Sequence, residues 1–289
     1  MASSGGRPKD EAGGPDVTSM FEPYLHRWGL VPDGDAISTP AADLLPVLRG
    51  GEKAMLKIAH ERAGRFGGAL LDWWQGQGAA RVLAADAPAL LLERASGPAS
   101  LAAMARAGQD DEACRIICDV AARLHAPRAR LLPELTPLAE WFRALEPAAA
   151  MHGGILPRCL RTAQRLLADP RDVAVLHGDL HHDNVLDFGA RGWLAIDPHG
   201  LIGERGFDFA NIFTNPDLAD PTRPLAIRPG IFAGRLGVVA QASGLERGRL
   251  LQWILAWTGL SAAWFLNDGD PLARIDLHIA ELAAAELDR

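Results

Sequence analysis

Apolar and polar residues alternate in two different ways along this chain, and the change between them divides it into two parts. Short apolar runs typical of strands occupy residues 36–39, 44–48, 54–59, 81–84 and 90–93. The pair Gly50-Gly51 separates the second run from the third, as a tight hairpin turn requires. One helical pattern, at residues 61–75, lies among these runs and ends before Gly76. The first part is therefore predicted to be a small sheet with one helix.

Helical spacing dominates the chain after Gly97 and Pro98. Apolar residues recur at this spacing between positions 113 and 124, behind Asp110 and Asp111, which we expect to act as N-caps. Further helices are predicted at 138–145 and 160–168, and at least two long ones near the C-terminus. The longest apolar run, 250–266, contains several polar residues and is short for a membrane span, so it predicts a buried helix.

The segment 177–184, His-Gly-Asp-Leu-His-His-Asp-Asn, is the most informative one. Two apolar runs follow it, on either side of a glycine-containing turn at 189–192, and predict a β-hairpin. If Phe188 faces Trp193 across the turn, then Asn184 faces Asp197, and Asp179 lies on the loop entering the same end. Amide and carboxylate oxygens are the ligands that Mg²⁺ prefers, so the arrangement predicts Mg²⁺-dependent phosphoryl transfer.

The composition is that of an ordinary globular protein of one large domain or two smaller lobes. The chain has 289 residues, of which 48% are hydrophobic and 22% charged, with a formal net charge of −7. This charge argues against non-specific binding to nucleic acids or anionic membranes, and it is compatible with a cationic small substrate. The three cysteines have neither disulfide-framework nor metal-site spacing, and we expect them to be reduced.

The N-terminus is rich in glycine, serine, proline and charged residues and contains no apolar signal-peptide core. We therefore expect a disordered leader at residues 1–19 and a cytoplasmic protein.

The motifs together resemble the protein-kinase-like aminoglycoside phosphotransferases, and most of all the branch of streptomycin 6-kinase and hydroxyurea phosphotransferase. The most specific resemblance is His177-Gly178-Asp179-Leu180-His181, followed by Asn184 and by Ile196-Asp197-Pro198. Less specific parts are residues 54–59, 73–79 and 90–94. The resemblance extends from about residue 20 to the C-terminus. It implies an α+β, two-lobed fold, with a nucleotide-binding lobe at 20–94 and a helical catalytic and substrate lobe at 95–289.

The resemblance also implies a role for each motif residue, with ATP and Mg²⁺ as cofactors. Asp179 would be the catalytic base that orients the substrate hydroxyl, and Asn184 and Asp197 would hold Mg²⁺. Lys57 would contact the phosphates of ATP. The connector between the two lobes, at Glu93, Arg94 and Ala95, would offer backbone groups to adenine. His177 and His181 would support the catalytic loop.

Several departures from the protein-kinase pattern carry their own predictions. Gly178 replaces an arginine that reads activation-loop phosphates, so we expect constitutive activity. The carboxylate partner of Lys57 is not evident, with Glu61 and Asp72 as weak candidates. Asp208 is expected to cap backbone amides of the catalytic loop. For a cationic acceptor, carboxylates of the helical lobe are the candidate ligands: Glu204, Asp217, Asp268 and Asp270.

The leading hypothesis is thus an ATP- and Mg²⁺-dependent kinase that phosphorylates a hydroxyl of a small molecule, with an aminoglycoside such as streptomycin first. A hydroxyurea kinase or another small-metabolite kinase would use the same motifs. A non-catalytic nucleotide-binding module is a second alternative, and a binuclear metallophosphatase is disfavoured because its further ligands are missing at motif spacing.

Overall fold

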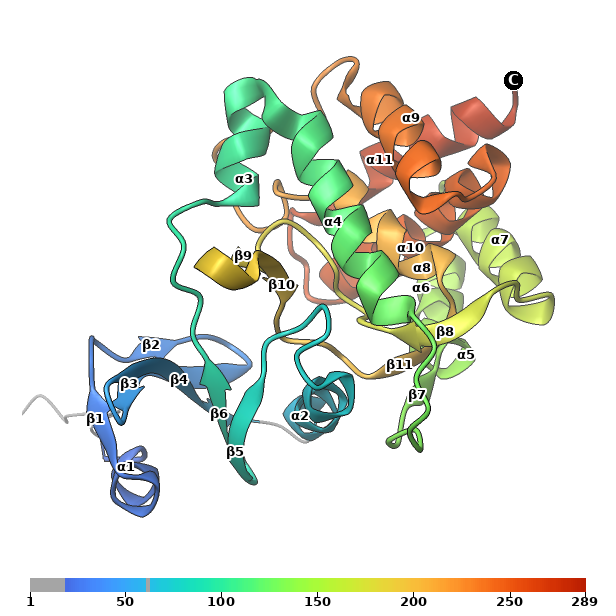
Figure 1. The fold of residues 1–289 in the computed structure, drawn as a ribbon. Helices are drawn as coiled ribbons and strands as arrows, with labels where there is room; N and C mark the ends of the chain where they lie inside the picture. The colour runs from blue at the N-terminus through green and yellow to red at the C-terminus, as the bar shows by residue number, and fades with distance from the viewer. Residues whose placement is uncertain (1–18, 61–62) are drawn as a thin grey trace, which may run out of the picture.

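A computed structural model of the protein describes residues 19–60 and 63–289. These residues form a small lobe of strands and a larger lobe of helices, joined by an extended linker between β6 and α3 (Figure 1). The predicted α+β, two-lobed, protein-kinase-like fold is therefore confirmed. The predicted leader at 1–19 lies, apart from its last residue, outside the described part of the chain.

The N-terminal lobe is built on a six-stranded antiparallel sheet in the order β1-β3-β4-β6-β5, with β2 paired to β3. Gly50 and Gly51 join β3 to β4 with φ angles of 59° and 87°, which forms the predicted two-residue turn. The elements of this lobe are α1 (Glu22–Trp28), β1 (Leu30–Pro32), β2 (Ile37–Ser38), β3 (Ala42–Arg49), β4 (Glu52–Ala59), α2 (Ala63–Trp74), β5 (Val82–Asp86) and β6 (Ala89–Glu93).

The alternation of buried side chains along β4 determines where Lys57 points. Ala54 and Leu56 are fully buried in the core of the small lobe. Because successive side chains of a strand point to opposite faces, Lys57 lies on the other face, towards the larger lobe. Two glycines let α2 pack closely at the same boundary, since a Cβ on Gly67 would lie 2.4 Å from the carbonyl oxygen of Pro198. A Cβ on Gly68 would lie 2.7 Å from Leu90.

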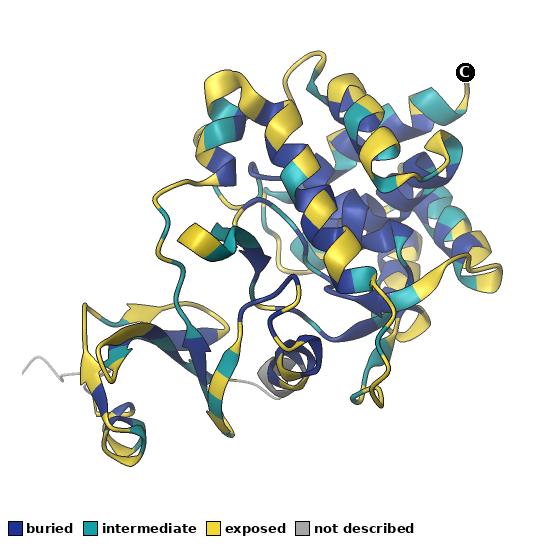
Figure 2. Cartoon of the chain, viewed as in Figure 1, coloured by how far each residue is buried: buried dark blue, intermediate teal, exposed yellow. Residues whose placement is uncertain are grey.

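The C-terminal lobe is organised around α10, which is buried along most of its length (Figure 2). Among the described helices, none is both long enough and apolar enough to cross a bilayer. The run at 250–266 lies in α10 and is mostly buried, so it forms a core helix as predicted. The helices of this lobe are α3 (Leu101–Met104), α4 (Asp110–His125), α5 (Leu138–Trp141), α6 (Leu145–His152), α7 (Leu156–Ala168), α8 (Gly206–Ala210), α9 (Ile231–Ser243), α10 (Arg247–Asn267) and α11 (Ala273–Leu287).

The strands of this lobe form two small sheets, one of which is the predicted catalytic hairpin. They are β7 (Thr136–Pro137), β8 (Val173–Leu176), β9 (Val185–Asp187), β10 (Trp193–Ala195) and β11 (Leu201–Glu204). The predicted register of the hairpin is wrong by one residue, because Asp187 and not Phe188 pairs with Trp193. The side chain of Phe188 instead packs in a small core with Ala80 and Leu194, and its N–H donates to the carbonyl of Gly192. Phe188 therefore belongs to the hairpin loop, which is one residue longer than predicted.

The hairpin also binds segments of the N-terminal lobe and the linker. The backbone of Ala195 accepts from the N–H of Ala80 and donates to the carbonyl of Gly78, both at 2.9 Å. In the linker, the N–H of Gly97 donates to the carbonyl of Asp187 at 2.9 Å. A Cβ on Gly97 would lie 1.9 Å from the Asp187 carboxyl carbon, so a larger residue here would displace that side chain. The hairpin therefore joins the two lobes.

The predicted N-cap role of Asp110 and Asp111 is wrong. The segment Ala105–Gln109 connects α3 to α4 across a kink at Gly108, whose φ is 90°, and no side chain caps the N-terminus of α4. Asp110 instead turns to α9 and forms a buried ion pair with Arg235, at 2.7 Å. The same guanidinium donates to the carbonyls of Ile212 and Asn215, at 2.5 and 2.6 Å. The pair thus fixes the segment that follows α8.

Replacing Asp110 with asparagine should lower the free energy of unfolding by about 3–5 kcal/mol, because it leaves the Arg235 charge buried without its counter-ion. Denaturant unfolding followed by circular dichroism measures this change. Asp111→Asn is the matched control, since Asp111 forms only an exposed ion pair with Arg115, at 3.7 Å. We expect the control to cost less than about 1 kcal/mol. Equal losses in the two variants would contradict a structural role for the buried pair.

Candidate active site

The backbone of the catalytic loop is fixed by one buried carboxylate. Asp208, on α8, accepts hydrogen bonds from the N–H groups of His177 and Gly178, both at 2.9 Å, and from His125 at 2.8 Å. Burial alone would raise the pKa of Asp208, but these hydrogen bonds and the nearby histidines lower it below its ordinary value. The geometry agrees with the capping role expected for Asp208, and the carboxylate stays ionised.

Two features of the loop depend on this anchoring. Gly178 has a φ of 91°, and a Cβ there would lie 2.9 Å from Leu201, so glycine is required at this position. His177 is fully buried, with Nε2 2.8 Å from the carbonyl of Ile196 and Nδ1 accepting from the N–H of Asp179 at 3.2 Å. Burial lowers the pKa of His177, so its ring is neutral and orients the loop.

Two asparagine amides hold the Asp179 carboxylate. Asn184 donates to Oδ2 at 2.9 Å and Asn211 donates to Oδ1 at 2.5 Å. Burial would raise the pKa of Asp179, but His181, His199 and His177 together lower it well below its ordinary value. Burial also lowers the pKa of His181, and Asp179 reverses this effect, so that the net shift is upward. Asp179 is therefore an ionised, oriented carboxylate, as a proton acceptor must be.

Asn211 was not among the residues predicted from the sequence. It lies three positions after Asp208, so the same short helical segment supplies one side chain to the loop backbone and another to the Asp179 carboxylate. Its own carbonyl oxygen Oδ1 accepts from Asn215 at 2.9 Å, which fixes the orientation of the amide. That position after a capping aspartate was the available sequence signal.

The ion pair between Lys57 and Asp197 brings the two lobes together at the site. Asp197 is thus the carboxylate partner of Lys57 that could not be identified from the sequence. Of the two weak candidates, Asp72 contacts Gln75 and Arg130 instead, and Glu61 lies outside the described residues. Asp197 has a φ of 58° and its side chain is about half exposed, with a relative accessibility of 52%.

The side chains of Asn184 and Asp197 offer oxygen ligands that fit a magnesium ion. Asn184 uses its amide nitrogen on Asp179, which leaves the carbonyl oxygen for another partner. In the register found, the N–H of Ile196 donates to the carbonyl of Asn184, so Asn184 and Asp197 lie one position out of direct opposition. Among the described residues, no three His, Cys, Asp or Glu side chains could enclose a metal. A few oxygens supplemented by phosphates are the usual environment of Mg²⁺ in kinases.

The connector residues predicted to meet adenine are held by ion pairs. Glu93 pairs with Arg191 of the hairpin turn and accepts from the N–H of Arg81 at 2.7 Å. Arg94 pairs with Asp33, beyond β1. These side chains are occupied structurally, so any contact of Glu93, Arg94 and Ala95 with a nucleotide is left to their backbone groups.

A cavity of about 360 Å³ opens beside Asp179, within the usual size range of ligand pockets. His181 and Asn211 line it together with Asp179, and α10 and the residue after it supply aromatic side chains, Ser261 and Asp268. The cavity therefore combines an ionised proton acceptor, a second carboxylate and aromatic surface. We call it the acceptor cavity.

The four carboxylates predicted for substrate binding lie in different environments. Glu204 is buried and binds Arg249 and Trp253. Asp217 is also buried and accepts a hydrogen bond from the N–H of Leu225 at 2.7 Å. Asp270 accepts from the N–H of Leu272, at the start of α11. Asp268 is the one of the four that lines the acceptor cavity.

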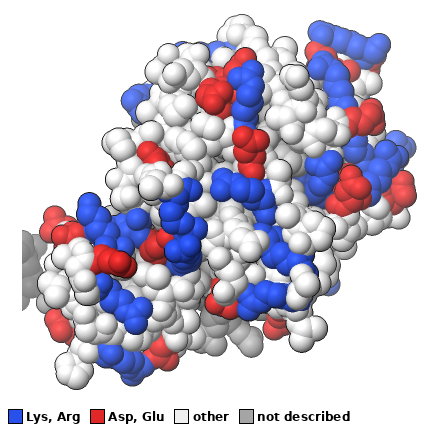
Figure 3. All heavy atoms as spheres, viewed as in Figure 1, with Lys and Arg blue, Asp and Glu red and all other residues white. Residues whose placement is uncertain are grey.

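Acidic and basic side chains are interspersed on both lobes in the drawn face of the molecule (Figure 3). Such mixing differs from the continuous basic stripe that tracks a nucleic-acid backbone.

Comparison with known proteins agrees with this geometry. The model of the family described as aminoglycoside/hydroxyurea antibiotic resistance kinase matches residues 27–269. The chain is 58% identical to streptomycin 3''-kinase of Klebsiella pneumoniae, over 91% of this chain and 100% of that protein. It is 32% identical to streptomycin 6-kinase of Streptomyces griseus, over 90% and 87% of the two chains.

Among solved structures, the fold matches a thermostable mutant of aminoglycoside phosphotransferase APH(4)-Ia in a ternary complex with AMP-PNP and hygromycin B. The TM-score is 0.68 at 14% identity, covering 92% of this chain and 97% of the other. Fold and site define a kinase with the protein-kinase-like architecture. The chain belongs to the aminoglycoside/hydroxyurea antibiotic resistance kinase family.

Replacing Asn211 with alanine should lower kcat by about 100-fold, because small displacements of a catalytic group have effects of this size. The KM for ATP should stay unchanged, since the side chain contacts the Asp179 carboxylate and not the connector. Steady-state kinetics separate the two parameters. Thr214→Val is the control, because this buried hydroxyl has only a long contact of 3.4 Å to the Asn211 carbonyl. An Asn211→Ala enzyme with the wild-type kcat would show that Asp179 does not need this amide.

Proposed function

We propose that the protein transfers the γ-phosphoryl group of ATP to a hydroxyl of streptomycin, at the 3'' position. The observation that carries this proposal is the acceptor cavity, which is lined by Asp179, a second carboxylate and aromatic side chains. The 58% identity to a streptomycin 3''-kinase, over that protein's whole length, supports both the acceptor and the position.

The acceptor side of the site suits a cationic sugar. Asp268 lies in the cavity wall with Trp257, Trp264 and Phe265 from α10. A guanidinium or ammonium group would pair with the carboxylate and lie against the aromatic faces. The acceptor hydroxyl would then reach Asp179.

In the transfer step, the acceptor hydroxyl oxygen forms a bond to the γ-phosphorus while the bond from that phosphorus to the β–γ bridging oxygen breaks. The hydroxyl proton passes to the Asp179 carboxylate, which is held ready by Asn184 and Asn211. A base of low pKa suits this reaction, because the transition state is loose and positioning contributes more than proton removal.

The nucleotide would bind where the lobes meet, at the Lys57–Asp197 pair. Lys57 would place its ammonium against the phosphates as a point charge, and the backbone of 93–95 would meet adenine. Asn184 and Asp197 would hold Mg²⁺, which, when bound, neutralises charge on the phosphates. His177 acts through the loop backbone, and His181 lies 3.4 Å from the Asp179 carboxylate at the cavity edge.

Asp179→Asn should abolish phosphorylation of streptomycin while ATP binding is kept, because the amide fills the same space but cannot accept the proton. An ATP-consumption assay with Mg²⁺, against streptomycin, other aminoglycosides and hydroxyurea, measures the reaction. Nuclear magnetic resonance of the product identifies the phosphorylated hydroxyl. Full activity of the variant would overturn the mechanism, and turnover of hydroxyurea alone would overturn the acceptor. Bound Mg²⁺-ATP without turnover of any acceptor would favour a non-catalytic module.

Asp268→Asn should raise the KM for streptomycin about 10-fold, which corresponds to about 1.4 kcal/mol for a charge-assisted contact. The kcat should change little, since Asp268 is not among the described groups that contact the Asp179 carboxylate. Asp270→Asn is the matched control, because this carboxylate is not part of the cavity lining and accepts from the N–H of Leu272, which an asparagine side chain can also do. If both variants raised KM alike, general electrostatic attraction would explain the effect and Asp268 would not be a specific ligand.

A further inference from the structure

Asp276, in the first turn of α11, is a buried carboxyl group that needs an explanation. The residue has no exposed surface, and neither carboxylate oxygen makes a hydrogen bond of normal geometry. Buried polar groups in native proteins nearly always have partners, and those that do not are often retained for function. No part of the phosphoryl-transfer site described above uses this residue.

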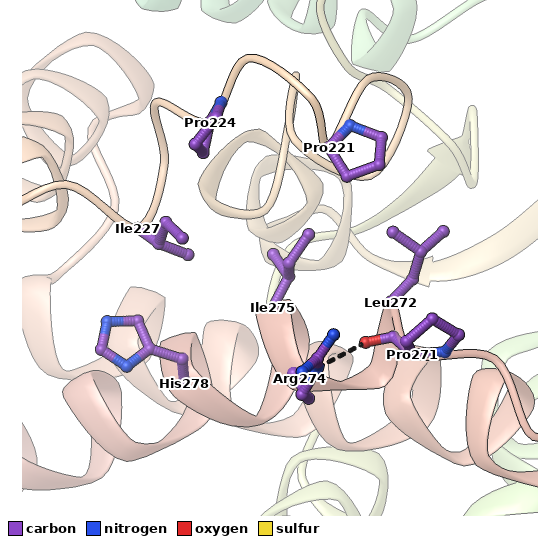
Figure 4. Close-up of a pocket in the computed structure, with 8 residues that line it drawn as sticks. All are labelled: Pro221, Pro224, Ile227, Pro271, Leu272, Arg274, Ile275 and His278. Carbon is purple, nitrogen blue, oxygen red and sulfur yellow. Dashed lines mark hydrogen bonds between the residues drawn. The ribbon is translucent and has the colours of Figure 1, made fainter.

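The side chain of Asp276 is directed towards α10. Leu272, at the N-terminus of α11, and Ile275 and His278 within the helix line an apolar groove. Pro221 and Pro224, in the loop before α9, lie opposite them (Figure 4). Asp276 is not part of this lining, and it lies on the helix face that carries the buried Ile279 and Ala280.

Ser261 connects Asp276 to the acceptor cavity. Its hydroxyl is near enough to act on the Asp276 carboxyl, although it makes no hydrogen bond of normal geometry, and the same serine lines the cavity with Trp257, Trp264 and Asp268. Asp276 therefore lies directly behind the cavity wall, with one small hydroxyl side chain between them.

The environment of Asp276 favours the neutral acid. Burial raises its pKa well above the ordinary value, and the Ser261 hydroxyl opposes this only in part. Charged groups on neighbouring elements are Asp268 at the end of α10, Asp217 in the loop after α8, and Arg274 and His278 on α11. None of them forms an ion pair or a hydrogen bond with Asp276. A cation entering the cavity would bring a positive charge to a carboxyl that has no such partner among the described residues.

We propose that Asp276 is a specificity-determining residue for cationic acceptors, which gives up its proton when a guanidinium or ammonium group occupies the acceptor cavity against Ser261. The proton leaves to solvent, and the resulting carboxylate faces the bound cation through the serine. This inference rests on the proposed function, because it names the acceptor group that the same cavity selects.

Two consequences separate this role from a purely structural one. Proton release on binding means that acceptor affinity rises with pH, up to the raised pKa of Asp276 in the free protein. The second consequence concerns stability. At neutral pH, isosteric Asp276→Asn should raise Tm, because the unfolded chain loses its proton at this carboxyl and folding has to restore it, whereas an amide does not titrate. A helix-dipole role in the first turn of α11 predicts the opposite, a lower Tm with unchanged acceptor binding.

The test is isothermal titration calorimetry of streptomycin into the full chain with Mg²⁺ and a non-hydrolysable ATP analogue. Repeating it in buffers of different ionisation enthalpy counts the protons released. We expect the wild type to release more protons than Asp276→Asn, with the difference approaching one, and the variant to bind at least about 10-fold more weakly. Glu281→Gln, the same charge change at an exposed position of α11, should match the wild type in both respects.

The possible failures are distinguishable. Equal proton release and equal affinity in wild type and Asp276→Asn would overturn the role of Asp276 and leave the kinase assignment intact. Proton-releasing binding that depends on Asp276, without phosphoryl transfer, would overturn the kinase assignment alone. A wild type that does not bind streptomycin would overturn both. A lower Tm with unchanged affinity in Asp276→Asn would establish the helix-dipole role instead.

Discussion

The capping of the catalytic loop by Asp208 is the interaction on which the rest of the site depends. One carboxylate holds two successive backbone N–H groups and a histidine from α4, so it joins three elements that are far apart in the sequence. Because Asp208 is buried, these hydrogen bonds are little weakened by water. The loop that carries Asp179 is therefore held by the large lobe before any substrate binds.

From this anchor, support for Asp179 spreads through the segment after α8. Asn211 holds the carboxylate, Asn215 holds Asn211, and Arg235 holds the backbone on both sides through the ion pair with Asp110. Each group in this series of contacts is buried or nearly so, and the loss of any partner would therefore lower the free energy of unfolding considerably. The energetic consequence is a site whose position is set by the core of the large lobe and not by its surface loops.

Sequence patterns predicted the fold and most motif residues, because those patterns are local. The strands, the Gly50-Gly51 turn and the 177–184 segment are each determined within a few residues. The failures involve long-range partners: Lys57 pairs with a residue 140 positions away, and Asp110 with one 125 positions away. The hairpin register failed because the burial of Phe188 with Ala80 competes with strand pairing, and spacing alone does not reveal it. Asn211 was missed because its sequence signal was only its spacing from Asp208, and an isolated amide has no motif of its own.

The attachment of the β9–β10 hairpin has a consequence for motion. By sequence the hairpin belongs to the large lobe, yet it hydrogen-bonds to residues 78–80 and to the linker, and its turn pairs with Glu93. The usual boundary between rigid bodies in a two-lobed protein therefore does not coincide with the linker here. If the two lobes move apart, either the Glu93–Arg191 pair breaks or the hairpin moves together with the small lobe. In the second case the residues that flank the hairpin, Asn184 and Asp197, are themselves the pivot.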